Sequence, residues 1–473
     1  MNHKLNHIPN NVKKIHLIAA CGTAMGALTS MLNDMGYDVT GSDSNIYPPM
    51  SDFLMEKGIK LFKGFDKDNL NSNPDLVIVG NAVVKNNPEA VEMIKRKIPF
   101  CSMPQAVNRF AAKDKKIILV TGTHGKTTTS SIIAHILDCA GLDPSFMIGG
   151  ILKNFSSNYR IGKGDYIVIE GDEYDTAFFD KGPKFMHYDP FITIITGVEF
   201  DHADIFADLN HVKQTFKNFI KKLSKNSLAV VCGDDENLNE LLDCKKCRME
   251  KYGLSPANHW SFDNFRVKSG KTVFNLKNPA GKGIEIVTDM MGRHNILNIL
   301  AAAGAAEEIG ISDECLVKAM TTFAGVKRRQ EIRGVKNGIT VMDDFAHHPT
   351  AVKETIAAVK PFFPDGRIIA VFEPRTNSSM RNVFQNIYPS SFCEADLVCI
   401  RKPSRIDKID VKERISSEKL AADIRAEGVD CFYFEDTDSI IEFLCKHAKK
   451  KDLLLIMSNG GFDNIHDRLL ECL

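Results

Sequence analysis

One stretch constrains the fold of this chain more than any other: residues 116–130 read KIILVTGTHGKTTTS. The apolar run at 117–120 has the length of a buried strand, and residues 127–140 have the pattern of a helix. A glycine-rich loop between a strand and a helix places free backbone N–H groups and the positive end of the helix dipole around an anion. The stretch therefore predicts a phosphate-binding strand, loop and helix.

The side chains of this loop suit a nucleotide. Lys126 supplies a full positive charge for β- and γ-phosphates, and the hydroxyl of Thr127 is placed to bind Mg²⁺. The usual phosphate-loop pattern has one more glycine, at the position where this chain has Val120, so the loop is a variant, and a lone Gly-Lys-Thr can also begin an ordinary helix. We expect the nucleotide to be bound by Gly122, Thr123, His124, Gly125, Lys126, Thr127 and Thr128.

Length and composition bound the possible functions. The 473 residues predict about three domains. Sixty Lys and Arg balance sixty Asp and Glu, which argues against a general nucleic-acid or membrane surface. The polar first 14 residues do not resemble a signal peptide and no apolar run reaches membrane-spanning length, so we expect a cytoplasmic protein. The twelve cysteines include a single C-x-x-C pair, Cys244 and Cys247, and we expect reduced thiols rather than a metal site.

A second glycine turn lies near the N-terminus. Residues 15–20 read as a strand, CGTAMG follows at 21–26, and a helix runs to Met35 before a second strand at 37–40. This pattern predicts a strand–helix–strand unit with an acid, Asp43, after its second strand. The turn would hold a nucleotide diphosphate, with Asp43 near a sugar or base; the alternative is ordinary helix–strand packing. The residues assigned to this site are Gly22, Thr23, Met25, Gly26 and Asp43.

Further strands along the chain also end in polar residues. Strands at 166–169 and 192–195 lead to Glu170, Glu173 and His202, and in an α/β sheet ligands gather outside the carboxyl ends of strands. Residues 256–287 read as β-rich, and a helix begins after Gly292. The C-terminal third predicts a second Rossmann-like layer, with strands at 339–342, 367–372, 397–400 and 453–457 and a helix capped by Thr350.

Taken together, the motifs resemble those of the Mur ligases, the ATP-dependent amide-bond ligases of bacterial peptidoglycan synthesis, over nearly the whole chain. The resemblance rests on GTHGKT at 122–127, Asp201-His202, RHNILN at 293–298, Arg329 and DDFAHHP at 343–349. It implies an α/β fold of three domains: a Rossmann-like UDP-sugar-binding domain (1–112), a central phosphate-loop ATPase domain (113–325) and a Rossmann-like C-terminal domain (326–473).

Other motifs are most similar to one branch of the family. They are YPPM at 47–50, EFDHADIF at 199–206, EPR at 373–375 and MSNGGF at 457–462. That branch joins UDP-N-acetylmuramate to the tripeptide L-alanyl-γ-D-glutamyl-meso-diaminopimelate through an acyl phosphate, in wall recycling. One alternative is the branch that adds a single L-alanine to the same nucleotide sugar. Another, of a different class, is a nucleotide-binding regulatory module without turnover.

The resemblance also implies roles for single residues. Thr127 and Glu170 would hold Mg²⁺, with Glu173 as second choice, and His202 would bind a second Mg²⁺. Asn295 and Asn298, three residues apart on one helix face, would contact the adenine, although Asn295 could instead cap the helix. Lys126, Arg329 and His348 would act on the phosphates, and Asp344 would lie near the ATP ribose or the phosphates. Arg375, Ser458 and Asn459 are candidates for the peptide. Lys327 and Arg328 would form surface or interdomain pairs. We expect ATP and Mg²⁺ as cofactors and a monomer or weak homo-oligomer.

Overall fold

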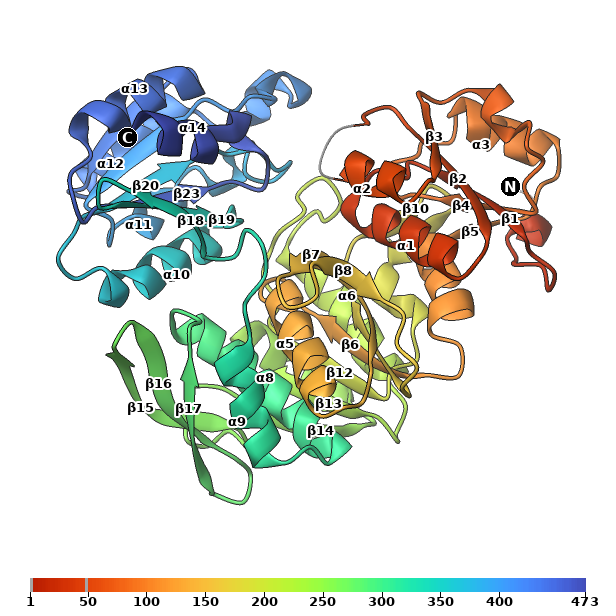
Figure 1. The fold of residues 1–473 in the computed structure, drawn as a ribbon, viewed down its shortest axis with the longest axis horizontal. Helices are drawn as coiled ribbons and strands as arrows, with labels where there is room; N and C mark the ends of the chain where they lie inside the picture. The colour runs from red at the N-terminus through yellow and green to blue at the C-terminus, as the bar shows by residue number, and fades with distance from the viewer. Residues whose placement is uncertain (1–2, 47–49) are drawn as a thin grey trace. The chain divides into compact units, whose positions relative to one another are not determined.

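The computed structural model describes residues 3–46 and 50–473; the YPPM motif falls largely outside them. The chain forms two compact units: Met1–Val198, Val212–Trp260 and Ala301–Ala319 make up the first, and Glu199–His211, Ser261–Leu300 and Met320–Leu473 make up the second. The mixed α/β fold with largely parallel sheets agrees with the predicted class (Figure 1). Within the described ranges, we find no helix of the length and apolarity needed to cross a membrane.

The first unit begins with a five-stranded parallel sheet in the order β3-β2-β1-β4-β5. The chain crosses from one side of β1 to the other, so a switch point lies at the carboxyl end of β1, where α/β sheets bind ligands. The elements are β1 (Lys14–Ile18), α1 (Thr23–Asp34), β2 (Asp38–Asp43), α2 (Met50–Glu56), β3 (Lys60–Lys63), β4 (Leu76–Val79), α3 (Pro88–Lys95), β5 (Phe100–Ser102) and α4 (Met103–Ala106). The predicted strand–helix–strand unit is confirmed.

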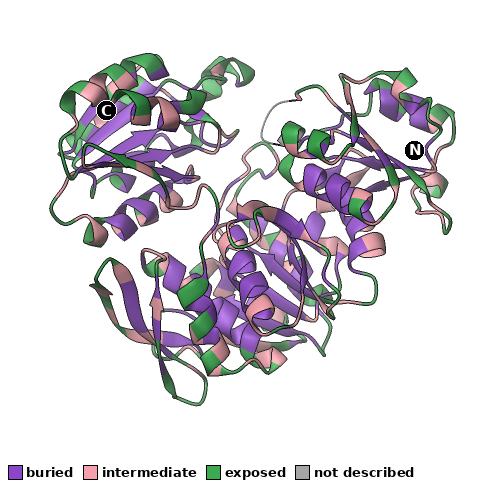
Figure 2. Ribbon diagram, in the orientation of Figure 1, coloured by how far each residue is buried: buried purple, intermediate pink, exposed green. Residues whose placement is uncertain are grey.

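A seven-stranded sheet in the order β14-β13-β12-β6-β9-β7-β8 forms the rest of the first unit, with only β8 antiparallel. Within this sheet, β12 and β13 are fully buried apolar runs, and buried strands fill the centre of the sheet in Figure 2, because helices cover both faces of such a sheet. The elements are β6 (Lys116–Thr121), α5 (Lys126–Cys139), β7 (Ser145–Leu152), β8 (Ser157–Arg160), β9 (Tyr166–Glu170), β10 (Asp175–Ala177), β11 (Asp180–Pro183), β12 (Ile192–Ile195), α6 (Leu209–Lys222), β13 (Leu228–Cys232), α7 (Glu236–Asn239) and β14 (Arg248–Tyr252).

The second unit contains a three-stranded antiparallel sheet and a six-stranded sheet in the order β18-β19-β23-β20-β21-β22. The first confirms the β-rich stretch and the second the Rossmann-like layer. The elements that follow β14 in the chain are β15 (Ser261–Lys268), β16 (Lys271–Lys277), β17 (Gly283–Thr288), α8 (Arg293–Ile309), α9 (Asp313–Thr322), β18 (Glu331–Lys336), β19 (Ile339–Asp344), α10 (Pro349–Val359), β20 (Ile368–Phe372), α11 (Tyr388–Ser391), β21 (Leu397–Arg401), α12 (Ser417–Ala426), β22 (Asp430–Phe434), α13 (Thr437–His447), β23 (Leu453–Met457) and α14 (Ile465–Cys472). The second half of α8 and most of α9 lie within Ala301–Ala319 and so belong to the first unit.

Alternation along β20 explains how the six-stranded sheet is buried on both faces. Ile368, Ala370 and Phe372 join a core with α10 and α12, whereas Ile369 and Val371 join a core with α13 and α14. Successive side chains of a strand point to opposite faces, so an unbroken apolar run needs a helical layer on each side. This packing fixes the carboxyl ends of the strands, where the polar residues lie.

Two local predictions were wrong. Cys445 and Cys472 form a disulfide between α13 and α14, although we expected reduced thiols throughout. The N-cap of α10 is His348, not Thr350, because Pro349 occupies the first helical position and the His348 ring accepts a hydrogen bond from the backbone N–H of Thr350 (3.3 Å).

Candidate active site

The loop between β6 and α5 requires both of its glycines. Gly122 has φ +123°, and a Cβ there would lie 2.3 Å from the Thr196 hydroxyl oxygen. Gly125 is the N-cap of α5 in the left-handed conformation, with φ +80°. Residues other than glycine rarely adopt such φ values, so the two glycines of the sequence G-T-H-G allow the backbone to form this tight loop before the helix.

Lys126 lies at the centre of a charged cluster. Its ammonium group donates to the Gly122 carbonyl (2.6 Å) and pairs with the Glu173 carboxylate (2.9 Å). Burial alone would lower the pKa of Lys126, but the charges of Glu173, Asp172 and Glu170 outweigh it and the pKa lies above its usual value. Lys126 is therefore a fixed positive charge at the mouth of the loop.

The two candidate metal carboxylates have different partners. Glu170, at the end of β9, accepts a hydrogen bond from the Thr127 hydroxyl (3.0 Å), so two oxygens predicted to bind Mg²⁺ lie together. Glu173 instead pairs with Lys126. Burial and the neighbouring Asp172 raise the pKa of Glu170. Hydroxyl and carboxylate oxygens suit a hard cation, so the Thr127–Glu170 pair fits Mg²⁺.

His202 belongs to the second unit, whereas Lys126 and Glu170 belong to the first. It has φ +53° and lines a cavity of about 240 Å³. The neighbouring Asp201 is buried, yet its hydrogen bond and charge interaction with His347, together with His202 and His348, hold its pKa well below the usual value. The cavity is lined by Asp201, His202, Asp204, His347, Thr376, Asn377, Ser378 and Asn459.

Several of these cavity residues escaped the sequence analysis. His347 lies in the quoted DDFAHHP motif, but no role was assigned to it. Thr376, Asn377 and Ser378 directly follow Arg375, beyond the end of β20. In an α/β sheet, polar residues that follow the carboxyl ends of strands often bind ligands, and this rule indicates His347, Thr376, Asn377 and Ser378.

The asparagines at the start of α8 are joined to Asp344. The Asn298 amide donates to Asn295 (3.2 Å), whose own amide donates to the Gln330 side chain (3.0 Å). The Gln330 backbone N–H in turn donates to Asp344 (2.8 Å). Asn295 is the third residue of α8 and its amide also donates to the Met291 carbonyl, so it is not the N-cap.

Arg329 and Asp344 lie in the same region. The Arg329 guanidinium lies over the Phe345 ring, 4.7 Å from its centroid. Burial raises the pKa of Asp344 although Arg329 and two backbone N–H groups oppose the shift. Burial, together with the charge of Arg329, lowers the pKa of the neighbouring His294 to about 4, so its ring stays neutral.

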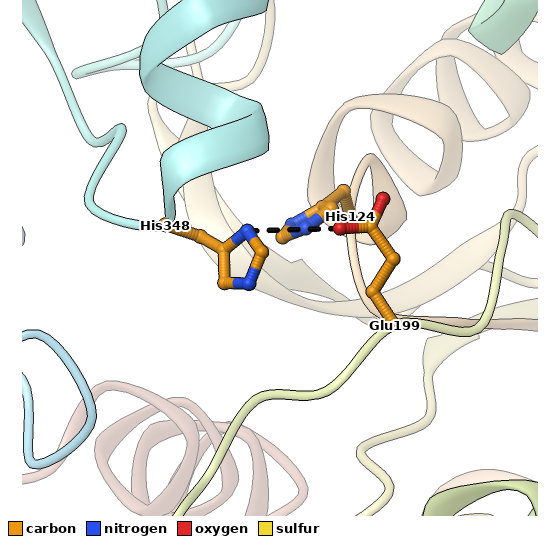
Figure 3. Close-up of side chains that lie close together, drawn as sticks. All are labelled: His124, Glu199 and His348. Atoms are coloured by element: carbon orange, nitrogen blue, oxygen red, sulfur yellow. Dashed lines mark ion pairs between the residues drawn. The ribbon is translucent and has the colours of Figure 1, made fainter. Parts of the chain in front are cut away.

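His348 is fixed by the segment that precedes His202. Its Nε2 lies 3.1 Å from the Phe200 carbonyl, and its Nδ1 lies 3.8 Å from the Glu199 carboxylate (Figure 3). Glu199 also accepts a hydrogen bond from the Thr350 hydroxyl (2.7 Å). The start of α10 is thereby bound to the 199–206 segment.

The N-terminal turn is held by backbone groups. The Asp43 carboxylate accepts hydrogen bonds from the N–H groups of Cys21 (2.9 Å) and Asn45 (3.0 Å), which places it beside the turn. Gly22 and Thr23 are exposed, whereas Met25 and Gly26 are buried. Among the predicted turn residues, Gly22 and Thr23 are thus open to a ligand and Met25 packs into the core.

The candidates for the peptide lie at the carboxyl end of the six-stranded sheet. The Ser458 hydroxyl donates to buried Glu373 (2.7 Å), and the Arg375 guanidinium lies 3.8 Å from the same carboxylate. Gly460 leaves room for Arg375, because a Cβ would lie 1.9 Å from its Nη1.

Arg328 differs from the expectation of a surface or interdomain pair. It donates to the Ser458 carbonyl (2.6 Å) and the Gly460 carbonyl (2.6 Å), and its Nε lies 3.4 Å from a carboxylate oxygen of Asp343. Arg328 therefore ties the loop after β23 to β19 within the C-terminal sheet.

Comparison with known proteins identifies this arrangement. Three family descriptions match the chain: "Mur ligase family, catalytic domain" over residues 14–115, "Mur ligase middle domain" over 120–306 and "Mur ligase, glutamate ligase domain" over 328–460. The chain belongs to the Mur ligase family. Members of the family are ATP-dependent ligases that form amide bonds, which agrees with a lysine-bearing phosphate loop beside paired carboxylates.

Individual Mur ligases are similar along the whole chain. UDP-N-acetylmuramate–L-alanyl-γ-D-glutamyl-meso-2,6-diaminoheptandioate ligases of Haemophilus influenzae and Escherichia coli are each 37% identical over 97% of this chain and 99% and 98% of their own. A crystal structure of a murein peptide ligase from Psychrobacter arcticus is 32% identical, covers 98% of both chains and has a TM-score of 0.73. UDP-N-acetylmuramate-alanine ligase from Thermotoga maritima has a TM-score of 0.80 at 23% identity over 98% of this chain and 99% of its own, which shows the shared fold.

Proposed function

We propose that this Mur ligase joins UDP-N-acetylmuramate to L-alanyl-γ-D-glutamyl-meso-diaminopimelate with ATP, in peptidoglycan recycling. One observation carries the choice of acceptor: the relatives named for this tripeptide are 37% identical over 97% of the chain. Relatives named for L-alanine reach 31–33% over comparable lengths. The EPR motif at 373–375 and the MSNGGF motif at 457–462 support the same branch, because they are similar to motifs of that branch.

The reaction needs an activated carboxyl group, because a carboxylate does not accept an amine at neutral pH. A carboxylate oxygen of the muramate bonds to the γ-phosphorus of ATP while the bond from that phosphorus to the bridging oxygen breaks and ADP leaves. The peptide amine then attacks the acyl carbon, loses a proton, and inorganic phosphate leaves. The protein positions the reactants and neutralises charge, and Lys126 is proposed to bind the β- and γ-phosphates.

Mg²⁺ would neutralise phosphate charge at this site. Thr127 and Glu170 are proposed to hold it, because their oxygens already lie 3.0 Å apart. Glu173 is the second choice, since it is engaged by Lys126. His202 is proposed to hold a second ion.

The remaining predicted residues are proposed to bind the substrates. Asn295 and Asn298 would contact the adenine, Asp344 the ATP ribose or phosphates, and Arg329 and His348 the transferring phosphoryl group. The Gly22–Gly26 turn and Asp43 would hold the UDP portion, and Arg375, Ser458 and Asn459 the peptide. We retain the domain boundaries 1–112, 113–325 and 326–473, a cytoplasmic location and a monomer or weak homo-oligomer as parts of the proposal.

The decisive experiment compares acceptors. The protein is supplied with ATP, Mg²⁺ and UDP-N-acetylmuramate, together with either L-alanine or the tripeptide, and phosphate release is followed with mass detection of the product. Turnover with the tripeptide and little with L-alanine is expected. The opposite preference would make the chain an alanine-adding ligase, and ATP binding without phosphate release in either case would indicate a regulatory module.

A further inference from the structure

The β7–β8 hairpin lies between the two proposed nucleotide sites of the first unit. β8 is the edge strand of the seven-stranded sheet, and α1 of the N-terminal sheet packs against both β7 and β8 (Figure 1). The N-terminus of α1 is the proposed diphosphate turn. The hairpin is thus the element through which that turn meets the ATP-binding sheet.

Two neighbouring residues of β8 hold α1 at its two ends. The Asn158 amide donates to the carbonyl of Thr23, the first residue of α1 (3.1 Å). The Tyr159 hydroxyl donates to Asp34, the last residue of α1 (2.6 Å), and Asp34 also pairs with Lys57 (2.8 Å). Burial and Asp34 raise the pKa of Tyr159 to about 12, so its hydroxyl keeps the proton that it donates.

The other strand of the hairpin reaches the proposed metal carboxylate. The backbone N–H of Gly149, on β7, donates to Glu170 (2.8 Å), whose second oxygen accepts from the Thr127 hydroxyl (3.0 Å). A Cβ on Gly149 would lie 3.0 Å from both Glu170 oxygens, so this close approach favours glycine. Hydrogen bonds therefore run from both strands of one hairpin, to the turn of α1 and to the phosphate loop.

The bond made by Asn158 is specific rather than a by-product of packing. Asn158 is 2% exposed, and its amide donates to a carbonyl in the exposed first residue of α1. Burying an amide costs free energy unless it is hydrogen-bonded, and an apolar side chain would fill the same space without that cost. The hydrogen bond to the turn therefore explains why a polar side chain occupies position 158.

We propose that the β7–β8 hairpin aligns the carboxylate of the UDP-sugar with the γ-phosphate of ATP. Asn158 is then a positioning residue that fixes the Gly22–Gly26 turn to the ATP-binding sheet. This inference rests on the proposed function, since it takes the turn as the UDP-sugar site. Phosphoryl transfer from ATP to the carboxylate needs the reacting atoms about 3–3.5 Å apart, and a displacement of about 1 Å can cost about 100-fold in rate. Loosening the turn should therefore slow the first chemical step more than it weakens binding.

The test separates chemistry from binding. Asn158→Asp and Asn158→Ala are incubated with ATP, Mg²⁺ and UDP-N-acetylmuramate, and the acyl phosphate is trapped with hydroxylamine as a hydroxamate. We expect hydroxamate formation to fall about 10–100-fold, while calorimetric dissociation constants for ATP and for UDP-N-acetylmuramate change by less than about threefold. Asn158→Asp, which keeps the shape but turns an oxygen toward the Thr23 carbonyl, should lose at least as much as Asn158→Ala.

Two further variants complete the design. Tyr159→Phe removes the bond at the other end of α1 and should give a smaller loss of the same kind, and Asn218→Ala, at an exposed position of α6, should behave as wild type. Wild-type hydroxamate rates in both Asn158 variants would overturn the inference, as would a larger loss in Asn158→Ala than in Asn158→Asp, which would indicate packing alone. Absence of hydroxamate with the wild-type protein would instead contradict the proposed function.

Discussion

Two turns of the first unit share a plan and differ in chemistry. In each, a central parallel strand leads through glycines into a helix: β1 into α1, and β6 into α5. Gly22 has an ordinary φ of −69°, and a Cβ added there would meet no neighbouring atom within 4 Å. Gly122 has φ +123°, and a Cβ added there would overlap Thr196. The first turn is bordered by Asp43 and backbone N–H groups, and the second by Lys126 and a cluster of carboxylates.

Under the proposed function, the first turn would bind a ligand and the second would take part in the reaction. A turn that only binds can use unstrained backbone and few charges. A turn that stabilises the charge of a phosphoryl group during transfer needs a fixed cation and metal-binding oxygens. Such a turn can also hold its backbone close to its neighbours, and strained φ values persist where the surrounding structure imposes them. Four predictions test this contrast.

The largest effect is expected for Lys126→Ala. Loss of the only charge that this loop offers the phosphates should lower the ligation rate about 1000-fold, by analogy with removal of a key transition-state donor. The dissociation constant for UDP-N-acetylmuramate, measured by calorimetry, should stay within about twofold because the N-terminal turn is a separate site. Loss of UDP-sugar binding in a folded variant would abolish the distinction between the two turns.

Matched alanine substitutions test the backbone contrast. Gly122→Ala places a Cβ against Thr196 in a conformation that costs about 1–3 kcal/mol, so ATP affinity should fall about 10–100-fold. Gly22→Ala meets neither obstacle, and its melting temperature should match that of wild type. Equal effects of the two substitutions on thermal stability would show that the turns are equally strained.

The carboxylates of the second turn can be separated by metal titration. Glu170→Gln should raise the Mg²⁺ concentration for half-maximal activity about tenfold, because it removes charge beside Thr127. Glu173→Gln should change the Mg²⁺ requirement by less than about threefold, since Glu173 pairs with Lys126 instead. A larger shift for Glu173→Gln would reverse the assignment.

The smallest effect is expected for Asp43→Asn. The substitution weakens two hydrogen bonds from backbone N–H groups, each worth about 1 kcal/mol, and should raise the KM for UDP-N-acetylmuramate about fivefold. The KM for ATP should not change. An equal rise in both values would show that the N-terminal turn and the phosphate loop respond as one site.

Much of the fold could be predicted because periodicity and strand ends are local signals. The predicted strand at 192–195 matches β12 at both ends, and α5 begins and ends one residue before the helix predicted at 127–140. The N-cap of α10 was missed because a histidine ring took a role that usually falls to Ser, Thr, Asp or Asn. The Cys445–Cys472 bridge joins two helices 27 residues apart in sequence, and no spacing rule marks such a pair.

The proposed site residues were chosen from the sequence, but the contacts between them could not be predicted from it. Strand ends indicated Glu170 and Glu173 together, yet only the folded chain shows that Thr127 bonds to one and Lys126 to the other. The link from Asn295 through Gln330 to Asp344 depends on residues from three separate segments. Sequence alone carries no signal for contacts of this kind, because they depend on how distant elements pack.

The Lys126–Glu173 pair has a consequence for which anions the enzyme accepts. The pair is nearly buried and its two charges offset each other, so the loop offers little unbalanced charge to an ion. Under the proposed function, an incoming phosphate would compete with Glu173 for the Lys126 ammonium group. Free phosphate or sulfate brings few compensating contacts, whereas a nucleoside triphosphate brings a base, a ribose and its metal. Under the proposed function, the pair would favour binding of the complete nucleotide over binding of small anions.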